Sequence, residues 1–309
     1  MMRKVLITGA AGNIGSALAH KLSSSGKYRV TGVDNFLTGS AHKLPALSSS
    51  FHFIKADVNN FNDISSIMTA NQFDYVFHYA AVVGVQRTLD NPIKVLEDIQ
   101  GIKNILDLSK NTGVKRVFCS SSSEVYGEPV EFPQNEATTP LNSRLPYAVV
   151  KNVGESFLRS YQKEYGLPYT IFRFFNTYGP RQSEDFVVAK FLKLALDNKP
   201  ITLYGEGKQT RTFCFIEDNL ETTWSCLENN HCVNDVMNLG NDNEISIKEL
   251  AEKIISITNS KSTITHLPAL AEGDMTRRKP DIAKMKAIIN RPLTTLEEGI
   301  RLTIQQRMF

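Results

Sequence analysis

The first half of the chain alternates short runs of apolar, often β-branched residues with longer amphipathic segments. The apolar runs predict strands at residues 4–7, 29–33, 52–55, 75–79, 116–120 and 170–174. The segments between them predict helices at residues 13–24, 62–69, 92–112 and 147–165. This order is typical of βαβ units, in which helices cover both faces of a parallel sheet. The sequence therefore predicts an α/β protein built on a doubly wound parallel sheet.

The second half of the chain is less regular, because four prolines at positions 200, 268, 280 and 292 shorten its elements. Its patterns predict helices at residues 186–198, 218–227 and 246–258, with Ser246 as an N-cap, and a strand at residues 201–204. We expect residues 1–175 to form the larger domain, with residues 213–236 returning to it. Residues 176–212 and 237–309 then form a smaller, mixed α/β lobe.

Composition excludes several classes of protein. Lys and Arg exceed Asp and Glu by only 35 − 32 = 3, and no basic stripe is present, so binding to nucleic acid is not expected. No run of about 18 apolar residues is present that could cross a membrane. The apolar stretch near the N-terminus is too short for a signal peptide.

The cysteines carry neither a disulfide framework nor a metal site. Cys119, Cys214, Cys226 and Cys232 include no C-x-x-C pair and have no zinc-ligand spacing. Free thiols of this kind are typical of a reducing compartment. We therefore expect a cytoplasmic protein without a metal ion.

A glycine-rich segment lies between the first expected strand and the first expected helix. Gly9, Gly12 and Gly15 there are spaced G-x-x-G-x-x-G. Glycines at such a position allow a tight turn and let a pyrophosphate approach the N–H groups at the positive end of the helix. By itself the segment is also consistent with a plain strand-to-helix turn.

Acidic residues follow the next two strands. Asp34 lies 19 residues after Gly15, where a carboxylate can accept hydrogen bonds from an adenosine ribose and would repel a 2′-phosphate. No Arg or Lys follows Asp34 before Lys43, which favours NAD over NADP. Asp57 is placed to reach the adenine amino group or to cap its loop. The glycine loop and Asp34 together predict a Rossmann-type dinucleotide-binding domain.

Tyr147 and Lys151 are four residues apart, so they lie on one face of the expected helix. A free phenol titrates near pH 10, and a nearby ammonium and a positive nicotinamide stabilise the phenolate. Four consecutive serines, 120–123, lie at the carboxyl end of an expected strand, where open α/β sheets bind ligands. Ser122 is best placed to hold a reacting oxygen near Tyr147. These groups suit hydride transfer from a sugar alcohol.

With these motifs together, the sequence resembles the extended short-chain dehydrogenases/reductases, in the nucleotide-sugar epimerase/dehydratase branch. The resemblance covers nearly the whole chain. The matching segments are residues 8–15, 34–35, 78–81, 122–127, 147–151, 173–180, 203–205, 209–211 and 277–281.

The resemblance implies bound NAD, a nucleotide-diphosphate sugar as substrate, and a homodimer formed through helices 92–112 and 147–165. The cofactor-binding residues that we expect are Gly9, Ala11, Gly12, Asn13, Ile14, Gly15, Asp34, Asn35, Gly39, Asp57, Val58, Tyr79, Ala80, Ala81, Ser120, Tyr147, Lys151 and Phe174. The resemblance also implies that Asn176, Arg211 and Arg278 contact the diphosphate, and that Val187 and Leu203 lie near the nucleobase. Tyr204 is a further expected substrate-binding residue.

One position departs from the family pattern. Asp98 stands where the family usually has an asparagine beside the cofactor. Either Asp98 keeps a hydrogen-bonding role or the local geometry differs.

The resemblance leaves the reaction open between three outcomes of C4 oxidation. Ser122 is followed by Ser123 and Glu124, whereas 4,6-dehydratases typically have an Asp-Glu pair that moves protons at C6 and C5. We therefore expect a UDP-sugar 4-epimerase, with Tyr147, Lys151, Ser122, Ser123 and Glu124 as the catalytic group. UDP-glucuronate decarboxylation is the alternative reaction, and 4,6-dehydration of a nucleotide sugar is the third choice.

Two further points stay open at this stage. Glu124 is either an acid-base group or a structural acceptor. Arg87 borders the expected sugar site and could attract a uronic carboxylate or face solvent. A protein that binds NAD without catalysis is disfavoured, since Tyr147, Lys151 and Ser122 are all present.

Overall fold

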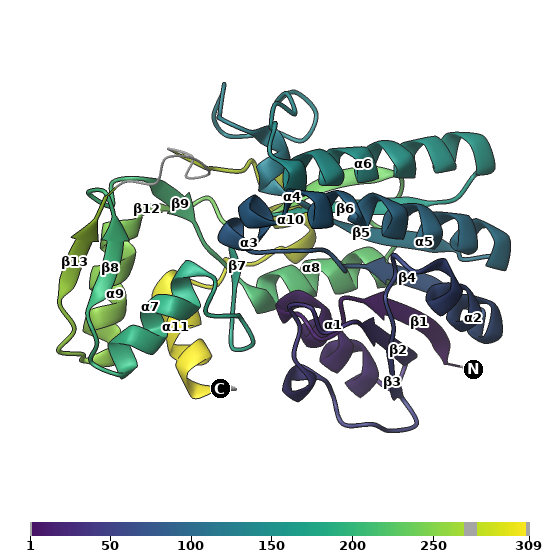
Figure 1. The fold of residues 1–309 in the computed structure, drawn as a ribbon, viewed down its shortest axis with the longest axis horizontal. Coiled ribbons are helices and arrows are strands. Elements are labelled where there is room, and N and C mark those ends of the chain that lie inside the picture. The colour runs from purple at the N-terminus through teal and green to yellow at the C-terminus, as the bar shows by residue number, and fades with distance from the viewer. Residues whose placement is uncertain (1, 269–276, 307–309) are drawn as a thin grey trace. The chain divides into compact units, whose positions relative to one another are not determined.

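The computed structural model describes residues 2–268 and 277–306 and divides into two compact units (Figure 1). The first unit comprises Met1–Val125, Ser143–Arg173 and Thr223–Met237. The second comprises Tyr126–Asn142, Phe174–Thr222 and Asn238–Phe309.

A seven-stranded sheet forms the centre of the first unit, in the order β11-β6-β5-β4-β1-β2-β3. The strands are β1 (Arg3–Thr8), β2 (Tyr28–Asp34), β3 (Phe51–Lys55), β4 (Tyr75–His78), β5 (Arg116–Ser122), β6 (Tyr169–Phe174) and β11 (Asp235–Leu239). The pairs β1–β2, β2–β3, β1–β4 and β4–β5 are parallel. The strand order reverses direction between β1 and β4, which is the doubly wound pattern. The predicted Rossmann-type fold is confirmed.

Helices pack on this sheet because alternate strand residues face opposite sides. The helices of this unit are α1 (Asn13–Ser24), α2 (Phe61–Asn71), α3 (Val85–Asp90), α4 (Pro92–Leu96), α5 (Asp98–Thr112) and α6 (Pro146–Tyr165), with the part of α8 (Ile216–Glu228) from Thr223 onward. Helices α3 and α4 pack on α6. Leu6, Val76, Val117 and Ile171 belong to the apolar cluster that α2, α5 and α6 cover (Figure 1). The rings of Phe77 and Phe118, each one residue further along its strand, stack at 4.3 Å on the other face.

The structure corrects two predictions for this unit. The single helix expected at residues 92–112 is two helices, α4 and α5, separated at Glu97. The interruption coincides with Asp98, whose side chain turns inward to accept a hydrogen bond from the Val82 N–H. Strand β11 was not expected from the sequence. Only its first two residues, 235 and 236, lie in the segment 213–236 that was expected to return to this domain.

The second unit contains three small two-stranded sheets: β7 (Thr177–Tyr178) with β10 (Cys214–Phe215), β9 (Thr210–Thr212) with β12 (Glu244–Ser246), and β8 (Ile201–Tyr204) with β13 (Ile264–Leu267). Its helices are α7 (Val187–Leu196), α9 (Ile247–Thr258), α10 (Ala283–Ile289) and α11 (Leu296–Gln305). The predicted N-cap Ser246 is confirmed, because its hydroxyl and Glu249 form a capping box at the start of α9.

The segment Tyr126–Asn142 packs with the second unit, although the sequence pattern did not separate it from the larger domain. Its main chain explains this position. The Gln134 N–H donates to the Lys279 oxygen and the Asp281 N–H donates to the Gln134 oxygen, both at 2.8 Å. The side chain of Asn238 also donates to the Gln134 oxygen.

Candidate functional site

The glycine loop between β1 and α1 is compact and has no room for larger side chains. Gly9 has φ +70°, and a Cβ on Gly15 would lie 2.2 Å from the Gly9 oxygen. Helix α1 begins after Gly12 without a side-chain cap and without an acidic residue in its first turn. In the described part of the chain, Asn13 Oδ1 is buried there without a hydrogen-bond partner. A helix start without a side-chain cap leaves its N–H groups free, and the glycines let a ligand come close to them. These features fit the pyrophosphate of a dinucleotide.

Asp34 closes this loop from the end of β2. Its carboxylate accepts hydrogen bonds from the N–H groups of Ala11 at 2.9 Å and Phe36 at 2.7 Å. Burial raises the pKa of Asp34, although these two donors and the charge of Lys43 oppose the rise. Gly39 lies close to the Asp34 carboxylate, since a Cβ on Gly39 would be 2.9 Å from Asp34 Oδ1.

Asn35 and Asp57 come together beside this loop. The Asn35 amide donates to Asp57 Oδ2 at 3.1 Å, and the Asn59 N–H donates to Asp57 Oδ1 at 2.9 Å. Asp57 therefore caps its own loop, and Val58, the next residue, is buried. Both residues remain candidates for the adenosine side of a cofactor.

The segment after β4 packs directly on the glycine loop. A Cβ on Gly9 would lie 2.7 Å from the Ala80 nitrogen and 2.8 Å from the Tyr79 oxygen. His78 contacts Thr8 Oγ1 through Nδ1 at 2.9 Å. Burial, with the nearby Lys151 charge, lowers the pKa of His78 to about 3, so its ring is neutral near neutral pH.

The four serines at the end of β5 have different partners. Ser120 accepts from Lys151, and Ser121 donates to Glu155 Oε1 at 2.7 Å. Ser122 is the last residue of β5, and its hydroxyl accepts from the Glu124 N–H at 3.2 Å. Ser123 begins a 3₁₀ turn and is buried. A hydroxyl that accepts one hydrogen bond can still donate one, so Ser122 can bind a further oxygen.

Tyr147 and Lys151 lie on one face of α6, as their spacing predicts. The Lys151 Nζ lies 5.7 Å from the centre of the Tyr147 ring. Lys151 is buried and donates to the Ser120 main-chain oxygen at 2.8 Å and to its hydroxyl at 3.2 Å. Tyr147 is half-buried against the apolar cluster of the sheet. The pair therefore sits at the carboxyl end of β5.

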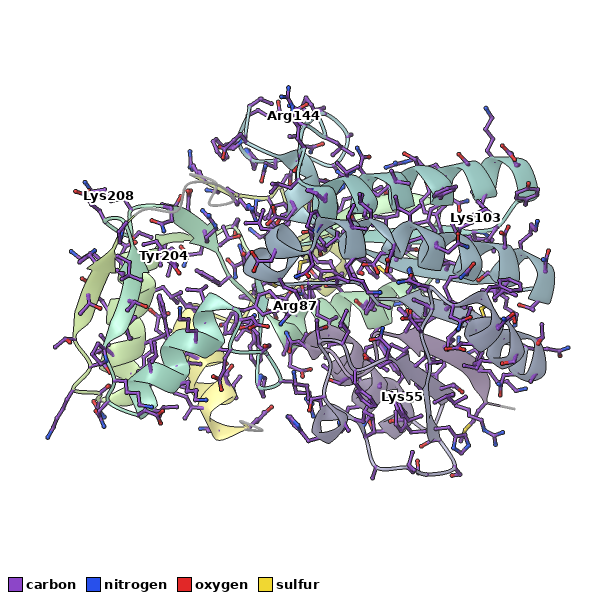
Figure 2. The ribbon with its side chains drawn as sticks, viewed as in Figure 1. Lys55, Arg87, Lys103, Arg144, Tyr204 and Lys208 are labelled. Carbon is purple, nitrogen blue, oxygen red and sulfur yellow. The ribbon has the colours of Figure 1, made fainter. Side chains whose placement is uncertain are left out.

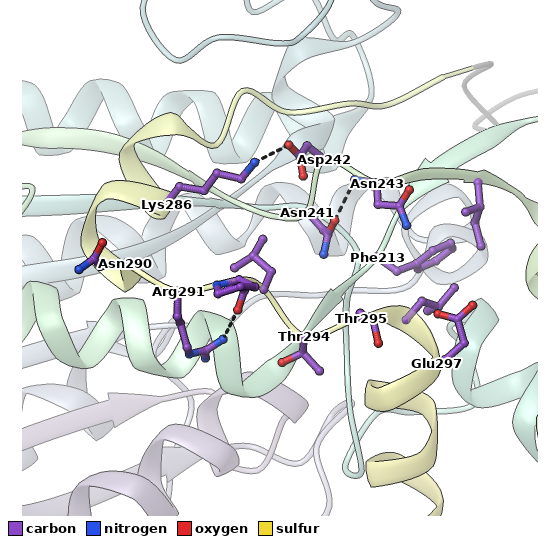
Figure 3. Close-up of a pocket in the computed structure, with 14 residues that line it drawn as sticks. Phe213, Asn241, Asp242, Asn243, Lys286, Asn290, Arg291, Thr294, Thr295 and Glu297 are labelled. Atoms are coloured by element: carbon purple, nitrogen blue, oxygen red, sulfur yellow. Dashed lines mark hydrogen bonds and ion pairs between the residues drawn. The ribbon is translucent and has the colours of Figure 1, made fainter.

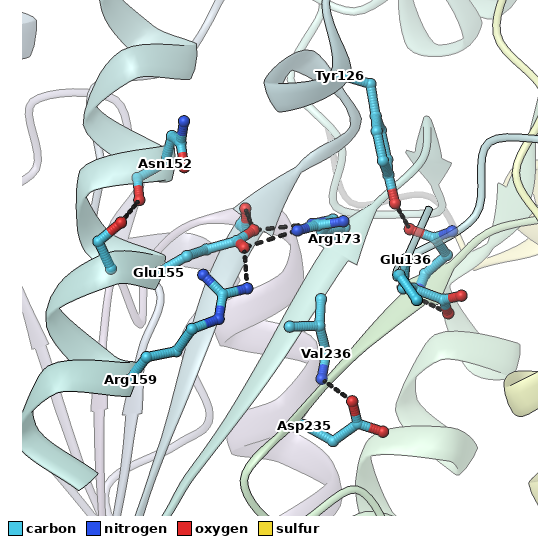
Figure 4. A network of polar contacts seen from close by, with 12 residues as sticks. Tyr126, Glu136, Asn152, Glu155, Arg159, Arg173, Asp235 and Val236 are labelled. Atoms are coloured by element: carbon cyan, nitrogen blue, oxygen red, sulfur yellow. Dashed lines mark hydrogen bonds and ion pairs between the residues drawn. The ribbon is translucent and has the colours of Figure 1, made fainter. Parts of the chain in front are cut away.

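A buried ionic network supports the serine run and was missed by the sequence analysis (Figure 4). Glu155 accepts from Arg173 Nε at 2.8 Å and Nη2 at 2.7 Å, and from Arg159 at 2.9 Å. Burial raises the pKa of Glu155, but the hydrogen bonds and charge of Arg173 outweigh burial and hold it below its usual range. Glu155 lies one helical turn after Lys151, and that spacing was the available signal.

Three expected substrate-binding residues gather around β9 within the second unit. Asn176, which has φ +38°, donates to the Thr212 oxygen at 2.9 Å. Arg211 is buried in β9 and donates to the Thr210 oxygen. Arg278 is buried, and its neighbour Arg277 forms an isolated parallel β-bridge with Thr210, the first residue of β9.

The remaining expected substrate residues are more dispersed. Val187 is the half-buried first residue of α7, and Tyr204 is 38% exposed at the end of β8 (Figure 2). Leu203 is only 1% exposed, so its side chain offers almost no surface to a ligand. Arg87 in the first unit donates to the Val83 oxygen of its own loop at 2.6 Å. Phe174 is buried at the end of β6.

A separate cavity of about 510 Å³ lies within the second unit (Figure 3). Its charged side chains are paired, since Lys286 lies 2.6 Å from Asp242, and Arg291 binds Asp218 and Glu221. None of the expected substrate-binding residues lines it. The cavity is therefore not part of the candidate site.

Two kinds of feature are absent from residues 2–268 and 277–306. In these ranges, no group of three or more His, Cys, Asp or Glu side chains could hold a metal ion. Across the same residues, no helix has the length and apolar character needed to cross a membrane.

Comparisons with known proteins agree with this geometry. Residues 5–240 match the NAD dependent epimerase/dehydratase family. A UDP-N-acetyl-alpha-D-glucosaminuronate decarboxylase from Bacillus cytotoxicus is 36% identical over 322 residues, covering 99% of this chain and 98% of the relative. The UDP-glucose 4-epimerase from Thermotoga maritima, solved with UDP-glucose, has a TM-score of 0.92 at 30% identity, covering 98% of both chains. A UDP-glucuronic acid 4-epimerase from Bacillus cereus, solved with UDP-glucuronic acid and NAD, has a TM-score of 0.88 at 30% identity, again covering 98% of both chains.

The chain belongs to the NAD dependent epimerase/dehydratase family. NAD is its cofactor, as expected from the glycine loop and Asp34. It is an enzyme of the group that contains nucleotide-sugar epimerases and decarboxylases. The relatives include isomerases and lyases, so membership does not choose between these two reactions.

Proposed function

We propose that this protein is an NAD-dependent 4-epimerase of a nucleotide-diphosphate sugar, with a UDP-sugar as substrate. The observation that carries the proposal is the arrangement at the end of β5, where Lys151 lies beside Tyr147 and binds Ser120 of the strand that ends at Ser122. A base, a cation beside it and a hydroxyl donor are what proton removal from a sugar alcohol requires. The relatives named as enzymes of UDP-sugars support the substrate class.

The chemistry of the chain's own residues is proton transfer at the C4 oxygen. Tyr147, as phenolate, accepts the proton of the C4 hydroxyl while Ser122 donates a hydrogen bond to the same oxygen. Lys151 stabilises the phenolate by its charge. When bound, NAD supplies the acceptor for the C4 hydride and the source of the hydride that returns to the opposite face. Tyr147 then gives the proton back to the C4 oxygen, so the enzyme ends in its starting state.

Residues of the first unit are proposed to bind the cofactor, and residues of the second unit are proposed to bind the substrate. The glycine loop and Asp34 suit the pyrophosphate and the ribose of NAD. Arg211 and Arg278 suit the substrate diphosphate, because planar, permanently charged guanidinium groups form paired hydrogen bonds with phosphate oxygens. With the Leu203 side chain buried, the exposed ring of Tyr204 is the better candidate to contact the nucleobase.

Decarboxylation of a UDP-uronate is the second candidate. The relatives that are named as decarboxylases support it. The Ser-Glu pair after Ser122 is consistent with decarboxylases and with epimerases alike. Dehydration ranks below both. Ser123 is 3% exposed and stands where a dehydratase would have an acid.

One incubation experiment distinguishes the candidates. The full-length protein with NAD is incubated separately with UDP-glucose, UDP-N-acetylglucosamine, UDP-glucuronate and dTDP-glucose, and products are identified by proton NMR. Epimerisation changes the H4 couplings and keeps all six carbons. Decarboxylation gives a pentose, and dehydration gives a 6-deoxy methyl signal. No conversion of any substrate would refute the proposed activity and favour a protein that only binds NAD.

A paired substitution tests the role of Tyr147. Tyr147→Phe removes the proton acceptor and should abolish conversion while leaving NAD binding nearly unchanged. Tyr165→Phe changes an exposed tyrosine at the end of the same helix and should leave conversion intact. Equal activity of the wild type and Tyr147→Phe would remove Tyr147 from the mechanism.

A further inference from the structure

Glu244 links the two segments of the second unit that carry the arginines proposed to bind the substrate diphosphate. It is the first residue of β12, and its Oε1 accepts a hydrogen bond from the Thr210 hydroxyl of β9. The Arg277 guanidinium donates from Nε to Oε1 at 2.6 Å and from Nη2 to Oε2 at 2.8 Å. Thr210 directly precedes Arg211, and Arg277 directly precedes Arg278. One carboxylate therefore joins both segments next to their arginines.

The main chains of the two segments also meet at this point. Arg277 forms its β-bridge with Thr210 along one edge of β9. Strand β12 pairs antiparallel along β9 as well, with Ile245 opposite Arg211. Neighbouring residues of a strand point to opposite faces, so the contacts of Glu244 lie on one face of β9 and the Arg211 side chain lies on the other. The carboxylate therefore acts on the strand from the face opposite to the Arg211 side chain.

Arg278 lies between two held points of its own segment. The residue before it is bound by the Glu244 carboxylate. The residues after it are held by Gln134, whose main chain pairs with Lys279 and Asp281 through hydrogen bonds of 2.8 Å. Loss of Glu244 would remove the ion pair on the side before Arg278 and leave the side after it unchanged.

The geometry of the Glu244–Arg277 pair is well defined. The Glu244 side chain is only 16% exposed. The hydrogen bonds from Arg277 hold the pKa of Glu244 below its ordinary value, although partial burial opposes them. The Arg277 guanidinium also lies 4.1 Å from the centre of the Phe132 ring. Two parallel hydrogen bonds and an aromatic ring fix the orientation of Arg277 as well as its distance from the carboxylate.

We propose that Glu244 is a positioning residue for substrate binding. By holding Thr210 and Arg277, it sets the spacing of the two arginines that follow them. The proposal rests on the proposed function, in which Arg211 and Arg278 bind the diphosphate of a nucleotide sugar. A negative charge by itself would repel a diphosphate, so a carboxylate that improves binding here acts through position.

Glu244→Gln separates the effect of position from that of charge. The amide can still accept a hydrogen bond, but the ion pair is lost. Charge alone predicts tighter binding of a diphosphate, because a negative group has been removed. Positioning predicts weaker binding. Asp242→Asn is the matched control, since it removes a carboxylate two residues earlier that is paired with Lys286 at 2.6 Å (Figure 3).

Binding of UDP and of dTDP to the full-length, NAD-saturated protein is measured by calorimetry, and the tighter ligand is used for the variants. In Glu244→Gln, its Kd should rise about fivefold, the scale of a partly exposed ion pair. Asp242→Asn should bind it as the wild type does. The affinity for NAD, titrated separately, should not change, because Glu244 and the glycine loop belong to different units.

A double-variant cycle tests the route through Arg277. Arg277→Lys keeps the positive charge but cannot form the same paired hydrogen bonds. It should weaken nucleotide binding by about the same factor as Glu244→Gln, and the combined variant should be little weaker than either one. Effects that multiply in the combined variant would overturn this route. Arg277→Lys also serves as the second variant if Glu244→Gln does not fold.

The outcomes separate this proposal from the proposed function. Calorimetry needs no turnover, so it decides the role of Glu244 even if no nucleotide sugar is converted. Where a sugar is converted, Glu244→Gln should raise KM and leave kcat near the wild-type value. A variant that melts at a lower temperature yet binds the nucleotide normally would show a merely structural role and overturn the proposal. Tighter binding in Glu244→Gln, or a wild type that binds neither nucleotide, would overturn it as well.

Discussion

The Lys151 ammonium lies 2.8 Å from the main-chain oxygen of Ser120. This hydrogen bond joins the second turn of α6 to the last residues of β5, the strand that ends at Ser122. It satisfies a buried ammonium without neutralising it, because a carbonyl oxygen and a hydroxyl carry no net charge. The full positive charge therefore stays beside the Tyr147 ring. A carboxylate partner in the same place would cancel that charge.

Lys151→Met should lower turnover by about 100-fold near neutral pH, in the range expected when acid-base catalysis is impaired. The proposed base Tyr147 loses the cation beside its ring, and the hydrogen bonds that join α6 to Ser120 are lost as well. The methionine roughly preserves the buried volume of the lysine stem. Lys163→Met, at an exposed position on the same helix, is the control. Wild-type turnover in Lys151→Met would contradict this role.

Asp34→Ala should weaken NAD binding and improve tolerance of NADP. The variant removes the group that would repel a 2′-phosphate, and the charge of Lys43, which acts on Asp34, then faces the phosphate. Calorimetric titration of both cofactors measures the change. Adding Lys43→Ala to Asp34→Ala should reverse the gain for NADP. An unchanged preference in Asp34→Ala would refute the assignment of Asp34 to the ribose.

The local features of the fold could be predicted because they depend on neighbours in sequence. The glycine loop depends only on a local strand-to-helix turn. The shared face of Tyr147 and Lys151 depends only on the geometry of one helical turn. Strand β11 could not be predicted, because five residues have no strong pattern and their place at the edge of the sheet depends on β6.

Long-range pairing explains the remaining misses at the site. Glu155 and Arg173 are 18 residues apart and meet only when α6 packs on β6. The inward turn of Asp98 likewise depends on Val82, which is 16 residues away. The sequence marked Asp98 as unusual, but the contact that interrupts the helix at Glu97 is tertiary. The burial of Leu203 could also not be predicted, because this residue lies in a short strand in the less regular second half of the sequence.

Glu155→Gln should destabilise the protein by about 3 to 5 kcal/mol, the usual cost of breaking a buried ion pair from one side. Arg173 would keep a buried charge without its carboxylate. The pKa of Glu155 is lower in the folded protein than its ordinary value, so the unfolded chain binds more protons. The stabilisation from Glu155 is therefore present above about pH 4.5 and is lost as the pH falls through the lower, folded value.

Chemical denaturation at several pH values checks this prediction. The difference between the wild type and Glu155→Gln should be constant from about pH 6 to 8 and shrink below about pH 4.5. Glu164→Gln, an exposed change on the same helix, should behave like the wild type. A stability loss for Glu155→Gln that does not diminish in acid would show that the ionised carboxylate is not the cause.

The protein should form a homodimer through α4, α5 and α6. Helices α4 and α6 pack together and carry exposed apolar side chains, with Ile93 71% exposed and Val149 36% exposed. Covering such a side chain is worth about 1.5 to 3 kcal/mol, so a partner surface there is favoured. Sedimentation velocity should show a dimer for the wild type and a monomer for Ile93→Asp. Leu47→Asp, at a loop position that is 74% exposed, should remain dimeric because it lies outside these helices. A wild-type monomer at assay concentration would exclude this assembly, and a dimer unaffected by Ile93→Asp would place the interface elsewhere.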